Sequence, residues 1–178
     1  RRPDGAALPA RLFPRRVRGM IIRPAQPADA AAMTALLNKI ISIGGTTAHQ
    51  HEKTQADVRA DYIDGPEALI CHVAESAGQV VGFQAVGVWP GLPQGWGDIG
   101  TFVAPGLQAR GTGQALFAAT CAAARARGLV ALNATIRADN RPGLAFYARA
   151  GFVDYAEDVG WALEDGRVVG RVSRRFDL

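Results

Sequence analysis

The hydrophobic pattern of the chain changes most clearly within residues 99–128, where a strand pattern gives way to a helical one. Residues 99–103 (IGTFV) form a short apolar run with β-branched and aromatic members, which is typical of a buried strand. A turn rich in Gly and Pro follows at 104–112. Apolar residues then recur at the spacing of one helical face, at Leu116, Ala119, Ala123 and Ala126. The pattern predicts a strand, a turn and a helix in succession.

Five elements are predicted ahead of this unit. Apolar residues at helical spacing follow Pro27, and two apolar runs further on are joined by the turn sequence Ser-Ala-Gly-Gln. The predicted elements are a strand at 20–23, helices at 27–41 and 53–62, and strands at 69–75 and 80–89. A loop at 90–97, rich in turn-forming residues, leads to the central strand.

The last part of the chain begins with an almost wholly apolar run at 130–136, as expected for a strand that is buried on both faces. Asn140 and Pro142 supply a cap and an early proline for a short helix, which Gly151 ends. Two strands then form a terminal hairpin, at 153–163 and 168–176. This order predicts an α/β fold with a single mixed β-sheet of about seven strands flanked by about four helices, in one domain over residues 20–178.

The positive charge of the chain is concentrated at its start. The formal net charge is +4, but residues 1–19 contain six Arg and one Asp. The rest of the chain has 14 basic and 15 acidic side chains, so it offers little support for a nucleic-acid face. We expect residues 1–19 to be a basic leader that is disordered or not native, with Met20 as the natural start. A native basic arm and a transit peptide are the alternatives.

Hydropathy and cysteine usage bear on where the protein works. The apolar runs are shorter than the roughly 20 residues that a helix needs to cross a membrane. Cys71 and Cys121 both lie in apolar runs, and buried thiols without a disulfide are typical of the cytoplasm. We therefore expect a cytoplasmic protein with two reduced cysteines and with neither a membrane nor a nucleic acid as partner.

The turn before the predicted helix at 113–126 has the chemistry of an anion site. The first N–H groups of a helix have no intrahelical partner, and the helix dipole is positive there. Gly111 and Gly113 have no Cβ, so a phosphate can approach the backbone closely, although any strand-to-helix turn also favours glycines. The chain has no P-loop sequence, and Leu116 stands where the Rossmann fingerprint requires Gly or Ala. Neither of these phosphate-binding motifs fits.

Two motifs of the chain resemble those of one family. The first is the run Gln108–Ala109–Arg110–Gly111–Thr112–Gly113. It resembles the Q/R-x-x-G-x-G/A signature of the GCN5-related N-acetyltransferase (GNAT) superfamily. The second, NRPGLAFYARAGF, begins at Asn140 and looks like a later segment of that family, with Tyr147, Gly151 and Phe152 in place. The resemblance covers about residues 20–178, and weaker features are similar to the branch that acetylates small amines such as phosphinothricin.

The resemblance implies acetyl-CoA (coenzyme A) as the cofactor. The backbone N–H groups of residues 108–113 would hold its pyrophosphate, and Arg110 would add charge nearby. In the family the pantetheine arm lies where the central strand diverges from the next one. There it would meet the backbone of Phe102 and Val103. Asn140 would also contact this arm, although an Asn before Arg-Pro is equally a good helix cap.

The resemblance also places the general acid. Tyr147 matches the family's tyrosine that protonates the departing thiolate, although an aromatic residue on this helix can also be part of the core. Asp98, Glu75 and His72 are the candidate bases that would take a proton from the amine. Asp98 is the nearest of these to the start of the central strand, where family members often carry a Glu.

Two further pairs of residues bear on the acceptor. His49 and His51 lie in the loop expected to border the acceptor site, but two His without an accompanying pattern of Cys or carboxylates do not indicate a metal. Trp89 and Trp96 would either wall the acceptor pocket or cap the end of the sheet. A closed pocket between them would favour a small acceptor, and an open acidic groove would favour a protein.

The sequence therefore predicts an acetyl-CoA-dependent N-acetyltransferase that acts on the primary amine of a small molecule. The amine would attack directly in a ternary complex, without a covalent enzyme intermediate. One alternative keeps this chemistry but takes a protein or peptide amine. Another is a regulatory module that binds CoA without catalysis. A homodimer is expected only by analogy with relatives.

Overall fold

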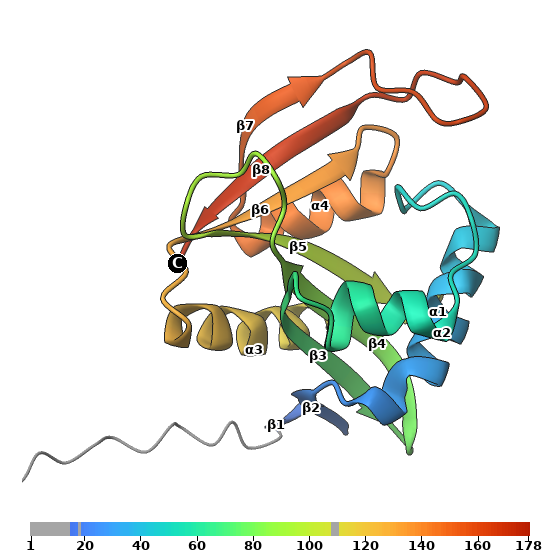
Figure 1. Ribbon diagram of the computed structural model, residues 1–178, viewed down its shortest axis with the longest axis vertical. Coiled ribbons are helices and arrows are strands. Elements are labelled where there is room, and N and C mark those ends of the chain that lie inside the picture. Colours follow the sequence, from blue (N-terminus) through green and yellow to red (C-terminus); the bar gives the residue numbers. More distant parts are fainter. Residues whose placement is uncertain (1–14, 18, 108–110) are drawn as a thin grey trace, which may run out of the picture.

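One mixed sheet runs through the molecule. In the computed structural model, which describes residues 15–17, 19–107 and 111–178, eight strands follow the order β1-β2-β3-β4-β5-β6-β8-β7 (Figure 1). Their bounds are β1 Arg15–Val17, β2 Met20–Pro24, β3 Ala68–Ser76, β4 Gln79–Gly87, β5 Trp96–Val103, β6 Ala131–Arg137, β7 Val153–Asp158 and β8 Arg171–Asp177. The β5–β6 pair is parallel, and the other neighbouring strands are antiparallel. The predicted single mixed sheet is confirmed.

Helices cover both faces of this sheet (Figure 1). They are η1 Pro27–Asp29, α1 Ala30–Ile43, α2 Gln55–Val58, η2 Arg59–Ile63, α3 Thr112–Ala126 and α4 Arg141–Ala150. On one face, α1 packs its apolar stripe against Val73 of β3 and Phe83 of β4. On the other face, α3 packs Leu116 against Val103 of β5, and α4 adds Tyr147 to the neighbouring part of the core.

The ends of α4 follow the signals that its sequence carries. The side-chain oxygen of Asn140 accepts a hydrogen bond from the Gly143 N–H at 2.9 Å, which caps the start of the helix. Gly151 ends the helix with a φ of 98°, a value that favours glycine. The Phe152 N–H then donates to the Tyr147 carbonyl at 3.0 Å. Both predicted caps are confirmed.

Three predicted elements have different bounds in the structure. The helix predicted at 53–62 is divided into one turn of α2 and the wider π turn η2. Strand β5 begins at Trp96 instead of residue 99, because residues 96–98 pair with β6, which a single sequence does not reveal. The terminal hairpin pairs only from Val153 to Asp158 with β8, and its longer connection keeps one bridge between Ala162 and Val168.

The sheet also contains one strand more than the predicted seven. Strand β1 lies within the segment that we predicted as a leader, and it pairs with β2 through Val17 and Met20. The first strand of the sheet therefore lies before Met20. Whether residues 1–19 are native stays a prediction.

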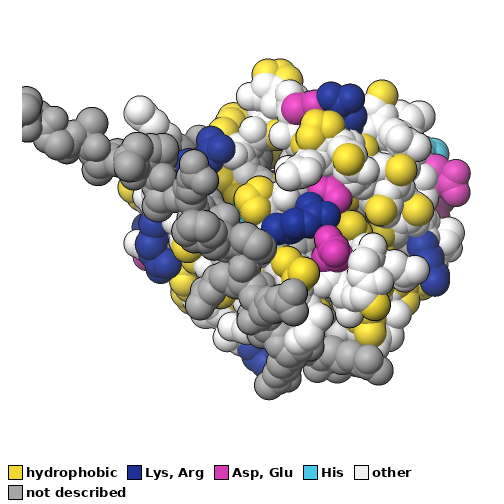
Figure 2. Space-filling view, turned by 90° about the horizontal axis from the view of Figure 1, so that it is seen from below, with side chains coloured by type: hydrophobic (Ala, Val, Ile, Leu, Met, Phe, Trp, Pro, Cys, Tyr) yellow, Lys and Arg dark blue, Asp and Glu magenta, His cyan; other side chains and the backbone are white. Residues whose placement is uncertain are grey.

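The described surface carries paired charges. Arg23 lies between Asp29 and Glu75, with its guanidinium nitrogens 2.8 Å and 3.1 Å from their carboxylate oxygens. On the face seen in Figure 2, Lys and Arg side chains are spread apart, and several lie beside acidic ones. Among the residues described in the structure, no helix has both the length and the apolar character needed to cross a membrane.

Candidate active site

Strands β5 and β6 separate after a short paired stretch. Residues 96–98 of β5 pair with 131–133 of β6, and their pairing ends there. Strand β5 continues to Val103 against β4 alone, while β6 continues to Arg137 against β8 alone. Phe102 therefore lies on a strand edge that β6 leaves uncovered, as the resemblance implied for the pantetheine arm. Backbone groups on such an edge are able to hydrogen-bond an extended ligand as an added strand would.

The turn before α3 is described only in part. Gly111 is the residue before the helix and has a φ of 83°, the left-handed conformation that glycine adopts without strain. Gly111 has no side chain to cap the helix, and the first N–H groups of a helix without a side-chain cap suit an anion. The Thr112 hydroxyl donates to the sulfur of Met20 at 3.3 Å and is buried. The predicted contacts of Gln108, Ala109 and Arg110 lie outside the described residues.

Gly113 has a different reason for lacking a side chain from the one its sequence suggests. A Cβ at this position would lie 2.8 Å from Cε2 of Phe146 on α4. The absent side chain therefore lets α3 approach α4. Tyr147 follows Phe146 directly, so this contact also bears on where Tyr147 lies. The predicted contact of the Gly113 N–H with a phosphate stays a prediction.

Replacing Gly113 with Ala is expected to lower the free energy of unfolding by about 1–2 kcal/mol, because overpacking outweighs the better helix propensity of Ala. Urea unfolding followed by circular dichroism measures this change. The matched control is Gln114→Ala, at an exposed position in the same turn of α3, which should change stability by less than about 0.5 kcal/mol. Equal stability of the Gly113→Ala protein and the wild type would contradict this account of the contact.

Asn140 uses both ends of its side chain within the protein. Besides capping α4, its amide nitrogen donates to the Thr46 carbonyl at 2.8 Å. Arg137 donates to the next carbonyl, that of Thr47, at 3.1 Å. The loop between α1 and α2 is thus fixed to the start of α4 and the end of β6. The predicted contact of Asn140 with the cofactor stays a prediction.

Tyr147 brings its hydroxyl to the uncovered part of β5. The hydroxyl lies 2.9 Å from the Thr101 hydroxyl, which also accepts a hydrogen bond from the Gln84 amide at 2.8 Å. Its ring packs edge-on against Phe146 and Phe152, so the residue belongs to the core as well. Burial, and then the charge of Asp98, raise the pKa of the Tyr147 phenol above its usual range, which keeps the hydroxyl protonated at neutral pH.

Asp98 is the last β5 residue paired with β6. Burial raises the pKa of its carboxyl to about 6, although a hydrogen bond from the Asn133 amide at 2.6 Å acts in the opposite direction. The Tyr155 hydroxyl in turn donates to the Asn133 side-chain oxygen at 2.6 Å. A carboxyl with this pKa is mostly ionised at pH 7 and still basic enough to take a proton, as a general base requires.

The other two candidate bases are far from this position in the sheet. Glu75 forms an ion pair with Arg23 at the β2–β3 side of the molecule. The His72 side chain is buried on the face that α3 covers. Of the three candidate bases, the structure therefore brings only Asp98 to the point where β5 and β6 separate.

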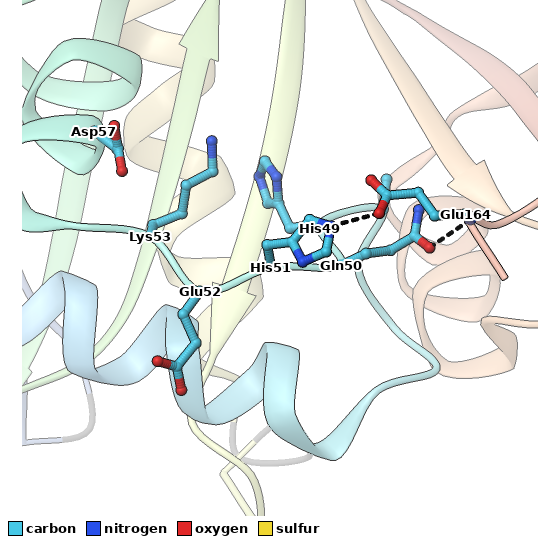
Figure 3. A pocket seen from close by; sticks show the side chains of 8 residues that line it. His49, Gln50, His51, Glu52, Lys53, Asp57 and Glu164 are labelled. Carbon is cyan, nitrogen blue, oxygen red and sulfur yellow. Dashed lines mark hydrogen bonds and ion pairs between the residues drawn. The ribbon is translucent and has the colours of Figure 1, made fainter.

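A pocket of about 360 Å³ lies between the loop that joins α1 to α2 and the loop that joins β7 to β8 (Figure 3). Its lining residues are Ala48, His49, Gln50, His51, Glu52, Lys53, Asp57 and Glu164. Figure 3 shows His51 and Gln50 reaching toward Glu164. His51 contacts the Glu164 carboxylate, and the Gln50 oxygen accepts from the Glu164 N–H at 2.7 Å.

His49 connects this pocket with β5. Its ring stacks on Phe102 at a centroid distance of 6.4 Å, and its Nε2 lies 2.7 Å from the Tyr62 hydroxyl. Burial, followed by the charge of Lys53, lowers the pKa of His49, so the imidazole is neutral near pH 7. Burial is the main cause that raises the pKa of Tyr62 and of Tyr147, and the charge of Asp98 adds to the rise at both. Asp98 is therefore within electrostatic reach of the pocket side and of Tyr147.

Neither predicted tryptophan lines the pocket. Trp89 is largely exposed beyond the end of β4. Trp96 packs edge-on against Tyr155, and the Arg175 guanidinium lies 4.8 Å above its ring. Trp96 thus lies at the end of the sheet, which was one of its two predicted roles, whereas Trp89 is a surface residue.

Sequence reasoning missed several residues of this region. Thr101 and Gln84 contact or support Tyr147, Asn133 binds Asp98, and Glu164 closes the pocket. None of them belongs to a motif. Thr101 could have been found because it immediately precedes the predicted Phe102. The others reach the site through strand pairing or from a loop more than 60 residues away, so no local signal marks them.

Comparison with known proteins bears on this site. The model of the acetyltransferase (GNAT) family matches residues 33–152. A curated relative, the mycothiol acetyltransferase of Clavibacter michiganensis subsp. michiganensis (strain NCPPB 382), is 38% identical over 93 residues, which is 52% of this chain. The matched region spans 29% of that relative's own length.

Solved structures share the fold. The ribosomal-protein-alanine N-acetyltransferase from Brucella melitensis has a TM-score of 0.76 and 24% identity, over 88% of this chain and 99% of that one. A phosphinothricin acetyltransferase (Pat) from Sinorhizobium meliloti, in complex with AcCoA, has a TM-score of 0.79 and 17% identity, over 90% of this chain and 89% of that one. The names of these two proteins point to different acceptors, so the common fold does not set the acceptor.

Proposed function

Because the chain belongs to the acetyltransferase (GNAT) family and contains an acetyl-CoA-dependent N-acetyltransferase domain, we propose that its acceptor is the primary amine of a small molecule. The amine binds in the pocket between the two loops and attacks directly in a ternary complex. The observation that carries this proposal is the pocket itself, whose volume of about 360 Å³ is at the lower end of the range for small-ligand sites.

The residues present suit the cofactor. The uncovered edge of β5 at Phe102 and Val103 suits an extended amide-containing arm, and the start of α3 at Gly111 suits a phosphate group. When bound, acetyl-CoA supplies the acetyl group as an activated thioester. With the cofactor at these positions, the acceptor binds on the side of β5 that faces the pocket, where His49 stacks on Phe102.

Two side chains divide the proton transfers. The Asp98 carboxylate takes a proton from the ammonium form of the acceptor, which frees the nitrogen lone pair. As the carbon–nitrogen bond forms and the carbon–sulfur bond breaks, the Tyr147 hydroxyl donates its hydrogen to the sulfur. The nitrogen then gives up its second proton, which restores the Tyr147 hydroxyl. Since the pKa of the Asp98 carboxyl is about 6 and that of Tyr147 is raised, both groups have the required protonation state between pH 7 and 8.

The lining of the pocket favours a cationic acceptor. Three of its residues carry carboxylates, namely Glu52, Asp57 and Glu164, and one carries an ammonium, Lys53. The Glu164 carboxylate also contacts His51, which an acceptor amine would have to displace or share. This excess of negative charge attracts an alkylammonium group. The same charge would suit the amine of a peptide, which is the second candidate.

Thiol release from acetyl-CoA, measured with free small amines and with peptides that carry the same amine, tests the acceptor class. We expect the higher kcat/KM with the free amines. In a Glu164→Gln protein the KM for the amine should rise while the KM for acetyl-CoA stays the same. Glu157→Gln, at an exposed position on β7 outside the pocket, is the matched control.

Two results would overturn the proposal. A peptide preferred over the free amine by more than about tenfold, or 1.4 kcal/mol, would assign the pocket to a protein acceptor. Acetyl-CoA that raises the Tm without thiol release on any amine would indicate a binding module. Acetyl-CoA at 100 times its Kd stabilises the native state by about 2.7 kcal/mol, so binding is detectable without turnover.

A further inference from the structure

Three buried polar atoms in the part of the chain that the structure describes have no hydrogen-bond partner. They are Nδ1 of His72, Oε1 of Gln84 and Oγ1 of Thr120. Their side chains are at most 3% exposed, so bulk water does not reach these atoms. Buried polar atoms almost always have a partner, because leaving one unpaired costs stability. Three such atoms therefore call for a common explanation.

The strand register places two of these residues side by side. His72 of β3 is directly opposite Gln84 of β4, and Gln84 is directly opposite Thr101 of β5. Residues opposite one another on antiparallel strands point to the same face of the sheet, with Cβ atoms about 5 Å apart. His72, Gln84 and Thr101 thus form one polar row across three strands, which we call the buried row.

Thr120 lies over the buried row from α3. One turn earlier in α3, Leu116 packs with Ala74 of β3 and Val103 of β5. Each of these lies two residues after the member of the buried row on its strand. One turn later, Ala124 packs with the core on the opposite side of the row, which includes Val86. Because residues four apart lie on the same helix face, Thr120 stands between these levels. The three residues with unpartnered atoms are therefore at one level between α3 and the sheet.

Thr101, the last residue of the buried row, contacts the Tyr147 hydroxyl. The Gln84 amide nitrogen donates to the Thr101 hydroxyl oxygen, so Thr101 is free to give its own hydrogen to the Tyr147 oxygen. If Tyr147 accepts from Thr101, its own hydrogen is left for another acceptor. The direction of hydrogen bonding is thus set by which atom of the Gln84 amide faces Thr101.

We propose that Gln84 is a positioning residue for Tyr147, held in orientation by one buried water bound to His72, Gln84 and Thr120. The structure directs the Gln84 amide nitrogen toward Thr101 and leaves the amide oxygen for another partner. A water that donates one hydrogen to this oxygen, and that also pairs with His72 and Thr120, stabilises that orientation. The hydrogen of Tyr147 is then directed to the uncovered edge of β5. This inference rests on the proposed role of Tyr147 as the acid.

One water suits the three atoms chemically. Buried waters in proteins typically make about three hydrogen bonds to groups that would otherwise be unsatisfied. The Thr120 hydroxyl is a donor and an acceptor, the Gln84 oxygen is an acceptor, and the His72 nitrogen takes either role according to its tautomer. Burial lowers the pKa of His72, so its ring is neutral and one ring nitrogen is free to accept.

A double-mutant cycle tests whether Gln84 acts through Tyr147. The variants are Gln84→Met, which keeps the length of the side chain without its polarity, Tyr147→Phe, and the two combined. We expect Gln84→Met to lower kcat about tenfold, with an unchanged KM for acetyl-CoA. In the Tyr147→Phe background the same change should lower kcat by less than about twofold, because there is no hydroxyl left to orient.

The control and the contrary outcomes separate this inference from the proposed function. Val86→Ala, at the next inward-facing position of β4, should lower the Tm while kcat stays unchanged. Equal losses from Gln84→Met in both backgrounds would overturn the positioning role. A Tyr147→Phe protein with full kcat would instead overturn the role of Tyr147, whatever Gln84 does.

Thr120→Val tests the water directly. Valine has the shape of threonine without the hydroxyl. If a water is bound, the substitution removes one of its partners, and the Tm should fall by a few degrees. If the space is dry, the same substitution removes an unsatisfied polar atom, and a higher Tm would then overturn the water site.

Discussion

Replacing Tyr147 with Phe is expected to lower kcat by roughly 100-fold, which is the lower range for loss of a positioned acid or base. The KM for acetyl-CoA should change little. The reason is that the substitution removes one atom, the hydroxyl oxygen that lies 2.9 Å from Thr101 beside the uncovered edge of β5. The departing thiolate then loses the hydrogen-bond donor that Tyr147 would supply.

The ring of residue 147 should keep its place in this variant. Phe preserves the edge-on contacts with Phe146 and Phe152, each at a centroid distance of 5.0 Å. The loss of one hydrogen bond should cost about 1 kcal/mol of stability. Steady-state thiol release together with thermal unfolding distinguishes a lost hydroxyl from a lost fold.

Tyr155→Phe is the matched control for this experiment. Tyr155 also has a hydroxyl in a hydrogen bond, to Asn133, but it lies on β7 and does not contact Thr101. We expect its kcat to fall much less than that of the Tyr147→Phe protein. Equal kcat values for the wild type and the Tyr147→Phe protein would exclude Tyr147 as the acid.

Replacing Asp98 with Asn is expected to lower kcat/KM for the amine by roughly 100-fold at pH 7 and to raise stability at the same pH. In the wild type, kcat/KM should rise with pH through about 6, as the Asp98 carboxyl loses its proton. The Asp98→Asn protein has no such group. Its residual rate should rise instead toward the pKa of the free amine, which is about 10.

The gain in stability follows from the direction of the pKa shift. Burial raises the pKa of the Asp98 carboxyl from its ordinary value of 3.8 to about 6, so the native state holds this proton more strongly. Its contribution to stability is present below pH 4 and is lost as the pH rises through 6. A pKa shift of this size lowers the free energy of unfolding of the wild type by about 3 kcal/mol above pH 6. The amide of the Asp98→Asn protein does not ionise, so the variant escapes this loss.

Urea unfolding of both proteins at pH 4 and pH 8 measures this effect. The Asp98→Asn protein should be the more stable one at pH 8, by roughly 2–3 kcal/mol, and the difference should shrink at pH 4. The amide oxygen still accepts from Asn133, so the local hydrogen bond persists. A variant that is less stable than the wild type at pH 8 would show that burial does not penalise this carboxylate.

The sequence determined the class of fold and most of its elements. Residues at helical spacing after Pro27, the apolar run at 130–136 and the caps Asn140 and Gly151 each specify a local conformation through their own chemistry. Such signals act within one or two turns of chain. They therefore remain readable when the rest of the molecule is unknown.

The bounds of several elements depended on pairing with distant segments. Residues 96–98 extend β5 beyond its predicted start, because all three pair with β6 and Asp98 also pairs with β4. The bounds of β7 and the presence of β1 also depend on pairing, with β8 and with β2 respectively. Local sequence carries no record of these partners.

The candidate site divides in the same way. Its motif residues, among them Tyr147, Asn140, Gly111 and Gly113, could be recognised in sequence because the family resemblance fixes their spacing. The tertiary structure alone decided that Gly113 makes room for Phe146, that Asn140 holds a loop, and that Asp98 is the candidate base nearest to the separation of β5 and β6. Hydrogen bonding, burial and pKa depend on which atoms surround a group. Those neighbours, such as Thr101, Gln84 and Asn133, come from other strands of the sheet.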